Sequence, residues 1–287
     1  MLLIYIMPTI ILNSTNVVNA PINNKLVYTF QNGGVTFTNN DIALAQFSLY
    51  YSWFNINQPI YNNNTCSYIW IDGTVVNITI PNGYYSALSL NAYIESVMVA
   101  NKHYLITSTG DFVYYIQLQE NVSFYAIQLN CYAVPSTLGT YTFPAGATWV
   151  LPITPKTPQF VVNSTSNFGL LIGFNAGSYP PTPQATTYSV ISQNTPQIQP
   201  ISSLNLICSI INNPFSVNRT LYSCGIPAVE FGQQISITPP NFLYNKIANG
   251  VYQEFTIDIL DQNNNPIQIL DNQIVIVLNI REQGDNQ

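Results

Sequence analysis

The stretch from Ile42 to Ile56 constrains the fold more than any other part of the chain. Its residues alternate between two faces from Ile42 to Trp53, and the odd-numbered face is the more apolar. This alternation is typical of a strand with one buried face, whereas a helix needs a period of about 3.6 residues. Residues 28–37 alternate in the same way around an Asn-Gly-Gly turn signal. The stretch therefore predicts a β-protein with a core strand at this point.

Further strand signals follow along the chain. Residues 67–71 and 74–80 flank Asp72-Gly73, which predicts a hairpin. Other runs rich in β-branched and aromatic residues are predicted to be strands: 112–118, 123–129, 160–162, 168–174, 203–211 and 235–238. We expect the last two runs, 255–260 and 274–280, to pair as a hairpin. Many strands at irregular spacing favour a β-sandwich or a jelly-roll barrel.

One segment has the pattern of a helix. Apolar residues between Leu88 and Val99 lie on one broad face, and Ser86 or Ser89 is placed to cap the N-terminus. Lys102 and His103 follow, where positive charge is favoured at a helix C-terminus. We predict one short helix that covers an open side of the sheet.

Charged residues make up only 6% of the 287-residue chain, against roughly a quarter in ordinary soluble domains. A surface so poor in charge tends to associate, which indicates that much of it lies against other subunits. An AT-rich genome would produce the same excess of Asn, and composition alone does not separate the two explanations. The net charge is −6 and the six basic residues are scattered, which argues against direct binding of nucleic acid.

The four cysteines are widely spaced and lie among apolar neighbours, so we expect buried free thiols: Cys66, Cys131, Cys208 and Cys224. The N-terminal segment lacks the basic region of a signal peptide. Pro8 also interrupts it before it is long enough to span a bilayer. We predict residues 1–25 to be an apolar arm that packs on a neighbouring surface, with no transmembrane segment.

The sequence contains few candidates for catalysis. His103 is the one histidine, and its place just past a helix predicts exposure. Glu254, Asp258 and Asp271 lie in or beside strands, where the solvent face carries charge. Glu254 or Asp258 remains the candidate for a glycosidase, which needs two carboxylates facing a cleft. The segment 261–265 resembles the start of a calcium loop, but Pro266 replaces the required Gly, and a polar turn is favoured.

The bottom-up prediction is therefore a non-enzymatic protein with no catalytic, cofactor-binding or metal-binding residues and no cofactor. A carbohydrate-binding jelly roll is the alternative, because the chain is rich in tyrosine and loops surround Trp70 and Trp149.

Three groups of residues occur in a characteristic order. They are LAQFSLYYSWFNI (44–56); IPNGYY (80–85) with GLLIGF (169–174) and Tyr179-Pro180; and LICSIINN (206–213), Asp261-Gln262 and IVLNIR (276–281). Together, from about Tyr28 to Glu282, they resemble the penton (minor capsid) proteins of virophages, Polinton-type viruses and related giant-virus lineages.

The resemblance implies a single jelly roll, an eight-stranded antiparallel sandwich, over residues 26–282. It also implies a β-rich inserted subdomain at about 61–185 and a short tail at 283–287. It further implies a virion protein that forms homopentamers at the icosahedral fivefold vertices and contacts the major capsid protein. A host surface receptor or glycan is a further expected partner. On this resemblance we expect the protein in the virion, after assembly in an infected host cell.

Overall fold

The computed structural model describes residues 8–215 and 217–282. Its packing divides the chain into two compact units. Unit 1 consists of Met1–Trp53 and Ile201–Gln287, and unit 2 consists of Phe54–Pro200. In sequence, unit 2 therefore interrupts unit 1 once. The predicted insertion, 61–185, lies within unit 2.

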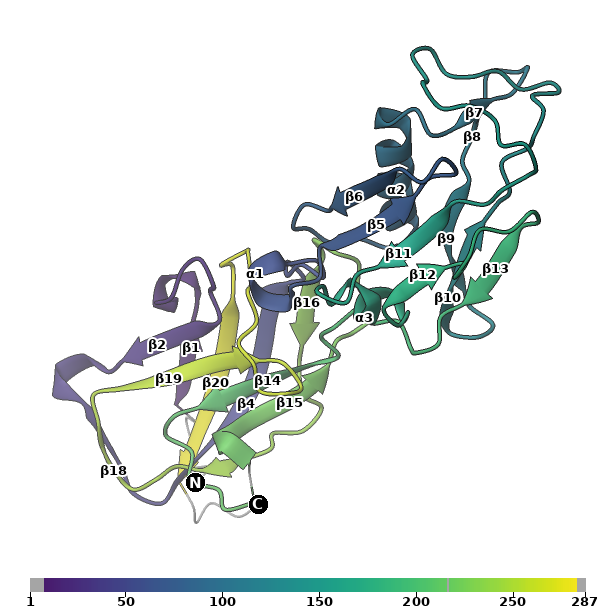
Figure 1. Ribbon diagram of the computed structural model, residues 1–287. Coiled ribbons are helices and arrows are strands. Elements are labelled where there is room, and N and C mark those ends of the chain that lie inside the picture. Colours follow the sequence, from purple (N-terminus) through teal and green to yellow (C-terminus); the bar gives the residue numbers. More distant parts are fainter. Residues whose placement is uncertain (1–7, 216, 283–287) are drawn as a thin grey trace. The chain divides into compact units, whose positions relative to one another are not determined.

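Unit 1 contains a five-stranded and a four-stranded sheet, both antiparallel, and eight of these nine strands form two four-stranded arrays (Figure 1). In the first array the order is β1 (Thr9–Leu12), β20 (Val275–Glu282), β4 (Asn40–Tyr50) and β16 (Gln234–Ile237), and β17 (Asn245–Lys246) also pairs with β4. In the second the order is β15 (Thr220–Gly225), β14 (Ser203–Cys208), β19 (Glu254–Leu260) and β2 (Lys25–Thr29).

The pairing of these eight strands is nested along the chain. The first strand pairs with the last (β1–β20), the second with the second-last (β2–β19), the third with the third-last (β4–β16), and the middle two with each other (β14–β15). This is the connectivity of a long hairpin folded over into two sheets, which is a jelly roll. The predicted all-β, jelly-roll fold is confirmed.

Alternate residues of the unit 1 strands are buried, as expected where each sheet packs one face on a shared core. On β20 the buried residues are Ile276, Leu278 and Ile280, and on β19 they are Phe255, Ile257 and Ile259. β1 follows the same rule, because Ile10 and Leu12 are buried while Ile11 is exposed. Part of the segment predicted as an arm is thus a strand of the first sheet, and residues 1–7 lie outside the described residues.

β4 changes its buried face part-way along. All of residues 41–44 are buried, and there Ile42 and Leu44 lie opposite the core residues Ile280 and Leu278. In the second half Phe47, opposite Ile276, and Leu49 take the core positions. The change occurs at a β-bulge: Leu44 pairs with Leu278 and Gln46 with Val277, so Ala45 has no residue of its own opposite. An extra residue shifts the alternation by one position. The expectation that the odd-numbered face is the core face is therefore wrong for the first half of the strand, where both faces are covered and the large apolar residues are even-numbered.

The remaining short elements of unit 1 lie in its connections. β3 (Val35–Phe37) pairs with β18 (Gly250–Tyr252) as a separate two-stranded ribbon. The 3-10 turns are Ser14–Asn16, Gln31–Gly33 and Val217–Arg219.

Unit 2 has three small antiparallel sheets. The four-stranded sheet has the order β12 (Gly177–Tyr179), β11 (Gln159–Val162), β5 (Thr65–Ile69) and β6 (Val75–Thr79). The three-stranded sheet has the order β13 (Tyr188–Ile191), β10 (Ala126–Cys131) and β9 (Ile116–Asn121). The third is the pair β7 (Leu105–Ile106) and β8 (Phe112–Val113). The predicted hairpin at Asp72-Gly73 is confirmed as β5–β6.

The predicted helix is α2 (Ala87–Ala100), and Ser86 caps it by accepting a hydrogen bond from the backbone N–H of Ser89. Leu90, Ile94 and Met98 on one face are fully buried in the core of unit 2. Asn91 on the same helix accepts a hydrogen bond from the backbone N–H of Leu118 on β9 (2.8 Å). The helix thus packs on the three-stranded sheet through both apolar and polar contacts.

Two sequence predictions about secondary structure are wrong. The run 168–174 contains a short helix, α3 (Phe168–Ile172), and α1 (Gln58–Tyr61) is another, so α2 is not the one helix of the chain. The runs 255–260 and 274–280 do not pair with each other, because β19 and β20 belong to different sheets. In a jelly roll the two strands joined by this connection belong to opposite sheets. A local hairpin signal in the sequence does not show to which sheet each strand belongs.

Candidate interaction surfaces

His103, predicted to be exposed, is buried in unit 2. Its ring stacks on the Trp70 indole with 4.6 Å between centroids, and its Nδ1 shares a hydrogen bond with the Tyr68 hydroxyl (2.8 Å). Burial lowers the pKa of His103, and the negative charge of Asp72 opposes that effect. The imidazole is neutral and enclosed, with Tyr68 as its polar partner. This is the geometry of a core histidine rather than of a general base with access to substrate.

The tryptophans offer no exposed ring for a sugar. Trp53, Trp70 and Trp149 are all buried, and the Trp149 indole N–H donates to the backbone oxygen of Lys102 (2.6 Å). Trp149 meets Trp70 edge-to-face at 5.1 Å between centroids. The loops around Trp70 and Trp149 therefore contribute to packing of the unit 2 core, contrary to the carbohydrate-binding hypothesis built on them.

The late carboxylates occupy separate structural roles. Asp258 faces Lys25 across β19 and β2 at 4.0 Å, and both side chains are partly exposed. Glu254 is exposed at the start of β19. Asp271 accepts a hydrogen bond from the backbone N–H of Gln273. The structure brings none of these three together in a hydrogen bond or ion pair within the described residues.

The segment 261–265 forms the polar turn that the sequence favours. Asp261 accepts hydrogen bonds from the backbone N–H groups of Asn263 and Asn265, each at 2.8 Å. Across residues 8–215 and 217–282, no group of three His, Cys, Asp or Glu side chains is arranged to hold a metal ion.

The four cysteines are free, as expected. Cys66, Cys131 and Cys208 are buried, while Cys224 is only partly buried. Burial raises the pKa of Cys131 and of Cys208 to about 12. Because the thiolate is the reactive form, these thiols are poor nucleophiles at neutral pH.

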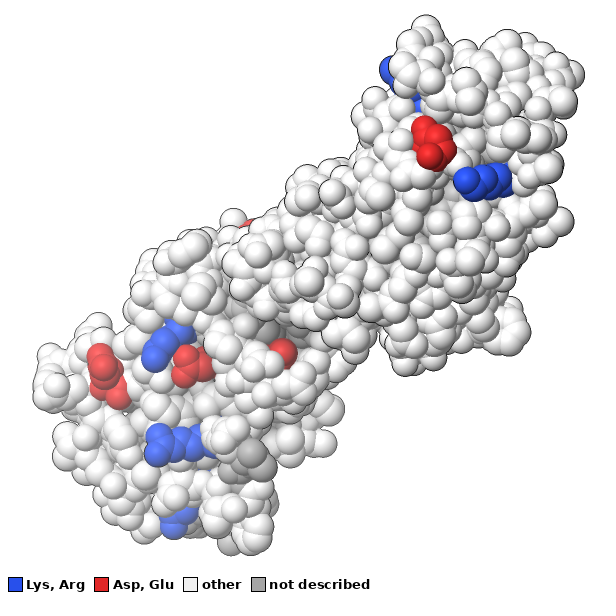
Figure 2. Space-filling view, viewed as in Figure 1, with Lys and Arg blue, Asp and Glu red and all other residues white. Residues whose placement is uncertain are grey.

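The protein surface says more about function than these individual residues do. Figure 2 shows charged side chains as isolated spots on a face that is otherwise neither acidic nor basic. Large apolar side chains are exposed at several places on both units, and at two of these places, one in each unit, three of them lie in the same or in joined loops. Neither was predicted, since an exposed Phe and a core Phe look the same in a sequence.

The first group, the end patch, consists of Phe215, Phe242 and Leu243 in unit 1. Their exposed fractions are 95%, 45% and 60%. They lie in two loops, after β14 and after β16, which amide hydrogen bonds join. Asn213 donates to Asn245 (2.9 Å), and Asn245 donates to the backbone oxygen of Leu243 (3.2 Å).

A charged cluster lies beside the end patch. The Arg281 guanidinium lies 3.8 Å from the ring centroid of Tyr244 and donates through Nε and Nη2 to Asp41 Oδ2, each at 3.2 Å. Tyr244 in turn contacts Phe242 edge-to-face. A ring contact therefore holds Phe242, and hydrogen bonds join the two loops that carry Phe215 and Leu243. Apolar groups held in this way lose little conformational freedom when a partner covers them.

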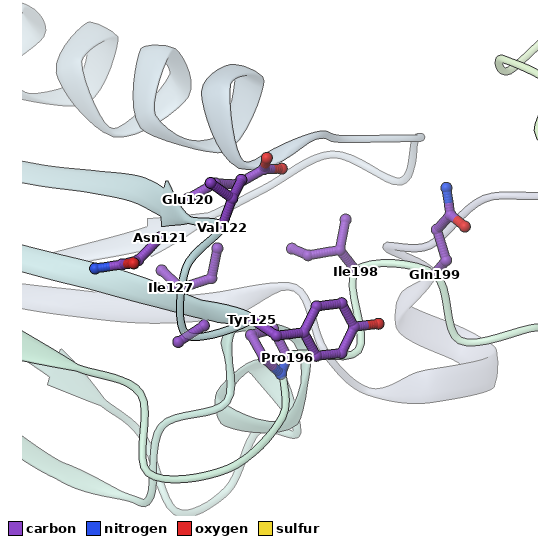
Figure 3. Close-up of a pocket in the computed structure, with 9 residues that line it drawn as sticks. Glu120, Asn121, Val122, Tyr125, Ile127, Pro196, Ile198 and Gln199 are labelled. Atoms are coloured by element: carbon purple, nitrogen blue, oxygen red, sulfur yellow. The ribbon is translucent and has the colours of Figure 1, made fainter.

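The second group, the tip patch, consists of Val122, Phe124 and Tyr125 at the turn between β9 and β10. Their exposed fractions are 84%, 68% and 77%. Tyr125 has φ +49°, in the left-handed region that aromatic residues rarely adopt. A cavity of about 370 Å³ lies beside the turn. In Figure 3 the Tyr125 ring and Pro196 line one side of it and Glu120 and Val122 the other, with Ile198 between them.

Among the described residues, no helix is both long and apolar enough to cross a membrane. No protein-family model matches the chain, and neither does any curated protein. Solved structures similar to it include two from virophage-type viruses. One is a structure of the Sputnik virophage by cryo-electron microscopy, with 10% identity and a TM-score of 0.34, covering 95% of this chain and 97% of that chain.

The other is the mavirus penton protein, with 11% identity and a TM-score of 0.44, covering 95% of this chain and 98% of that chain. Because both TM-scores lie below 0.5, we base the functional proposal on residues of this chain. Both similarities extend over 95% of this chain.

Proposed function

We propose that the protein is a structural virion protein that acts by burying its apolar surface against neighbouring subunits. The observation that carries the proposal is the end patch, in which large apolar side chains project from the loops of a jelly roll. Full burial of a Leu or Phe side chain contributes about 1.5–3 kcal/mol. With charged residues at only 6% of the chain, few charges would lose their hydration when such a surface is covered.

The specific form of this proposal is a penton. Five copies would form a ring at an icosahedral fivefold vertex and contact the surrounding major capsid protein. In such a ring one surface of each copy meets a different surface of the next, and the rotation closes the assembly. The end patch is too small to supply the roughly 1,200–2,000 Å² of a stable interface alone. It would form its apolar centre, with Asn and Gln side chains around it setting the register.

Two measurements test the proposal: the mass of the assembly that the purified protein forms in solution, and the change in that mass when the end patch is mutated. Native mass spectrometry at micromolar concentration is expected to detect a five-copy assembly. The double variant Phe215→Ser with Leu243→Ser should shift the population toward monomer by at least tenfold in dissociation constant. Electron microscopy of particles should then locate the protein at the fivefold vertices.

A matched control is Val251→Ser, which removes an apolar side chain of 70% exposure elsewhere in unit 1. It should leave the assembly unchanged. A stable monomer at micromolar concentration would count against the proposal. An assembly equally insensitive to the double variant and to the control would show that the end patch is not the contact.

The structure offers no support for the two alternative functions, a lectin and a glycosidase, at the residues that suggested them. Trp70 and Trp149 are buried, so they cannot serve as stacking surfaces of a lectin. Asp258 forms an ion pair with Lys25 on the outer face of a sheet, a solvated role that does not need catalysis.

A further inference from the structure

Three features meet at the cavity beside the tip patch. One is an aromatic ring with an open face, that of Tyr125. Another is the carboxylate of Glu120, which makes no hydrogen bond or ion pair among the described residues. The third is the strained backbone of Tyr125, at φ +49°. A strained conformation persists only where the surrounding structure imposes it, and such positions cluster at functional sites.

The turn geometry explains how the ring is presented. Asn121 and Ala126 are paired at the end of the β9–β10 hairpin, and the backbone N–H of Phe124 donates to the Asn121 oxygen (3.1 Å). This tight turn forces one residue into the left-handed region. Gly or Asn would occupy that position at little cost, yet the chain places Tyr there. The result is a phenol ring of 77% exposure that lines the cavity rather than packing in the core.

The residues that line the cavity limit what it can bind. Its volume of about 370 Å³ lies at the lower end of the roughly 300–1,000 Å³ range of small-molecule sites. No lysine, arginine or histidine is among the residues that line it, so an anionic group would meet Glu120 without compensation. A wholly apolar ligand would desolvate that carboxylate at a cost. The occupant is therefore neutral or cationic and carries hydrogen-bond donors.

The arrangement of the lining favours one ligand with both an apolar face and a polar edge. In Figure 3 the Tyr125 ring forms one side of the cavity, while the Glu120 carboxylate and the Gln199 amide are separate from it. The sugar ring of a neutral saccharide has this division, because its C–H groups can pack on an aromatic face while its hydroxyls donate to a carboxylate. We propose that this cavity is a binding site for a neutral saccharide unit.

The site lies wholly in unit 2, and the proposal does not depend on the assembly proposed above. It also differs from the carbohydrate-binding alternative considered from the sequence, which relied on two tryptophans that are buried.

Saturation-transfer NMR on the full-length protein tests it. The probes are methyl α-mannoside, methyl β-galactoside and N-acetylglucosamine, with N-acetylneuraminic acid as the anionic probe and arginine methyl ester as the cationic one. We expect transfer to at least one neutral saccharide and none to the anionic probe. Tyr125→Asn should reduce that transfer at least fivefold, because Asn tolerates the left-handed backbone but lacks the ring. Glu120→Gln should reduce it less.

The matched control is Phe124→Ser, which removes an aromatic side chain from the same turn that does not line the cavity. It should leave the transfer unchanged. A one-dimensional proton spectrum with unchanged methyl dispersion verifies that each variant is folded. Absence of transfer to all three neutral saccharides would overturn the proposal, and so would equal transfer in wild type and Tyr125→Asn. Transfer to arginine methyl ester alone would overturn it in favour of a cationic partner.

Discussion

The two units bury their apolar side chains in different ways. Unit 1 alternates residues along long strands, so its core consists mainly of aliphatic and Phe side chains such as Leu278, Ile257 and Phe255. Unit 2 has shorter strands and a helix, and its core includes polar groups: the His103 imidazole, the Tyr68 hydroxyl and the Trp149 indole. Unit 1 also buries polar groups, among them Asp41 paired with Arg281, but its large core side chains depend on the register of the strands. In unit 2 the buried polar groups lie among the aromatic rings of the core itself.

This difference has a physical consequence. A strand that slips by one residue exchanges its two faces and exposes every core side chain it carries. A buried polar group that loses its partner keeps the cost of desolvation. We therefore expect unit 1 to be most sensitive to changes in chain length and volume, and unit 2 to lost hydrogen bonds and to protonation.

The largest effect should follow deletion of Ala45, the bulge residue of β4. Without it, the alternation that buries Phe47 and Leu49 would turn Ile42 and Leu44 outward. At about 1.5–3 kcal/mol for each side chain, the loss is a large part of the 5–15 kcal/mol that stabilises most domains. Hydrogen exchange measured by mass spectrometry should show lost protection of β4 and β20, with β5 and β6 of unit 2 still protected.

Ala45→Ser is the control for that deletion, because it keeps the chain length at a residue that is not fully buried. Its protection should match wild type. If the deletion and the substitution behave alike, the bulge does not determine the register of β4.

A smaller but still large effect is expected for Leu278→Ala in unit 1. Leu278 is fully buried opposite Leu44, and truncation of a buried leucine costs about 2–5 kcal/mol. Val277→Ala on the outer face of the same strand should cost less than about 1 kcal/mol. Urea unfolding of both variants provides the comparison. Similar losses for the two would contradict the assignment of inner and outer faces on β20.

In unit 2, Tyr68→Phe should lower the stability through a lost hydrogen bond. The substitution removes a hydroxyl with little change in volume and leaves His103 Nδ1 without its partner. An unsatisfied buried group costs about 1–3 kcal/mol. The control is Tyr125→Phe, which removes the same hydroxyl from an exposed ring and should have no measurable effect. Urea unfolding with exchange protection of β5 as the local probe distinguishes the two.

Much of unit 1 follows from local patterns. Alternation in residues 255–260 and 274–280 predicts the strands, and Asp72-Gly73 in unit 2 predicts its hairpin. Which strands become neighbours does not follow, because β19 and β20 lie in different sheets. No local sequence pattern predicts the bulge at Ala45 either. It arises from pairing with β20, which is more than two hundred residues away in sequence.

In unit 2 the errors have other causes. The run 168–174 is short and apolar, which fits a strand or a helix equally. The run closes on itself, because the backbone N–H of Phe174 donates to the Gly169 oxygen (2.9 Å) and Gly173 ends the helix in the left-handed region. His103 is buried because Trp70 and Trp149 approach it from other parts of the chain. The end patch and the tip patch were missed because exposure is a property of the folded surface.

The smallest effect should be a dependence of unit 2 stability on pH. Burial lowers the pKa of His103 in the folded state below its ordinary value of 6.5. The unfolded state therefore binds the proton more readily, and the free energy of unfolding decreases as the pH falls below about 6.5. The slope is at most about 1.4 kcal/mol per pH unit for one group. The decrease stops once the pH falls below the pKa of His103 in the folded state.

His103 is the one histidine of the chain, so a slope between pH 7.5 and 5 has no other histidine as its source. Urea unfolding at several pH values, with exchange protection of β5 and α2 for unit 2 and of β20 for unit 1, measures it. His103→Gln should abolish the dependence in unit 2 whatever its effect on stability at pH 7.5. An equal slope in both units, or one that persists in His103→Gln, would mean that carboxylates rather than the enclosed imidazole govern the response. In that case the buried imidazole would no longer distinguish the pH response of unit 2 from that of unit 1.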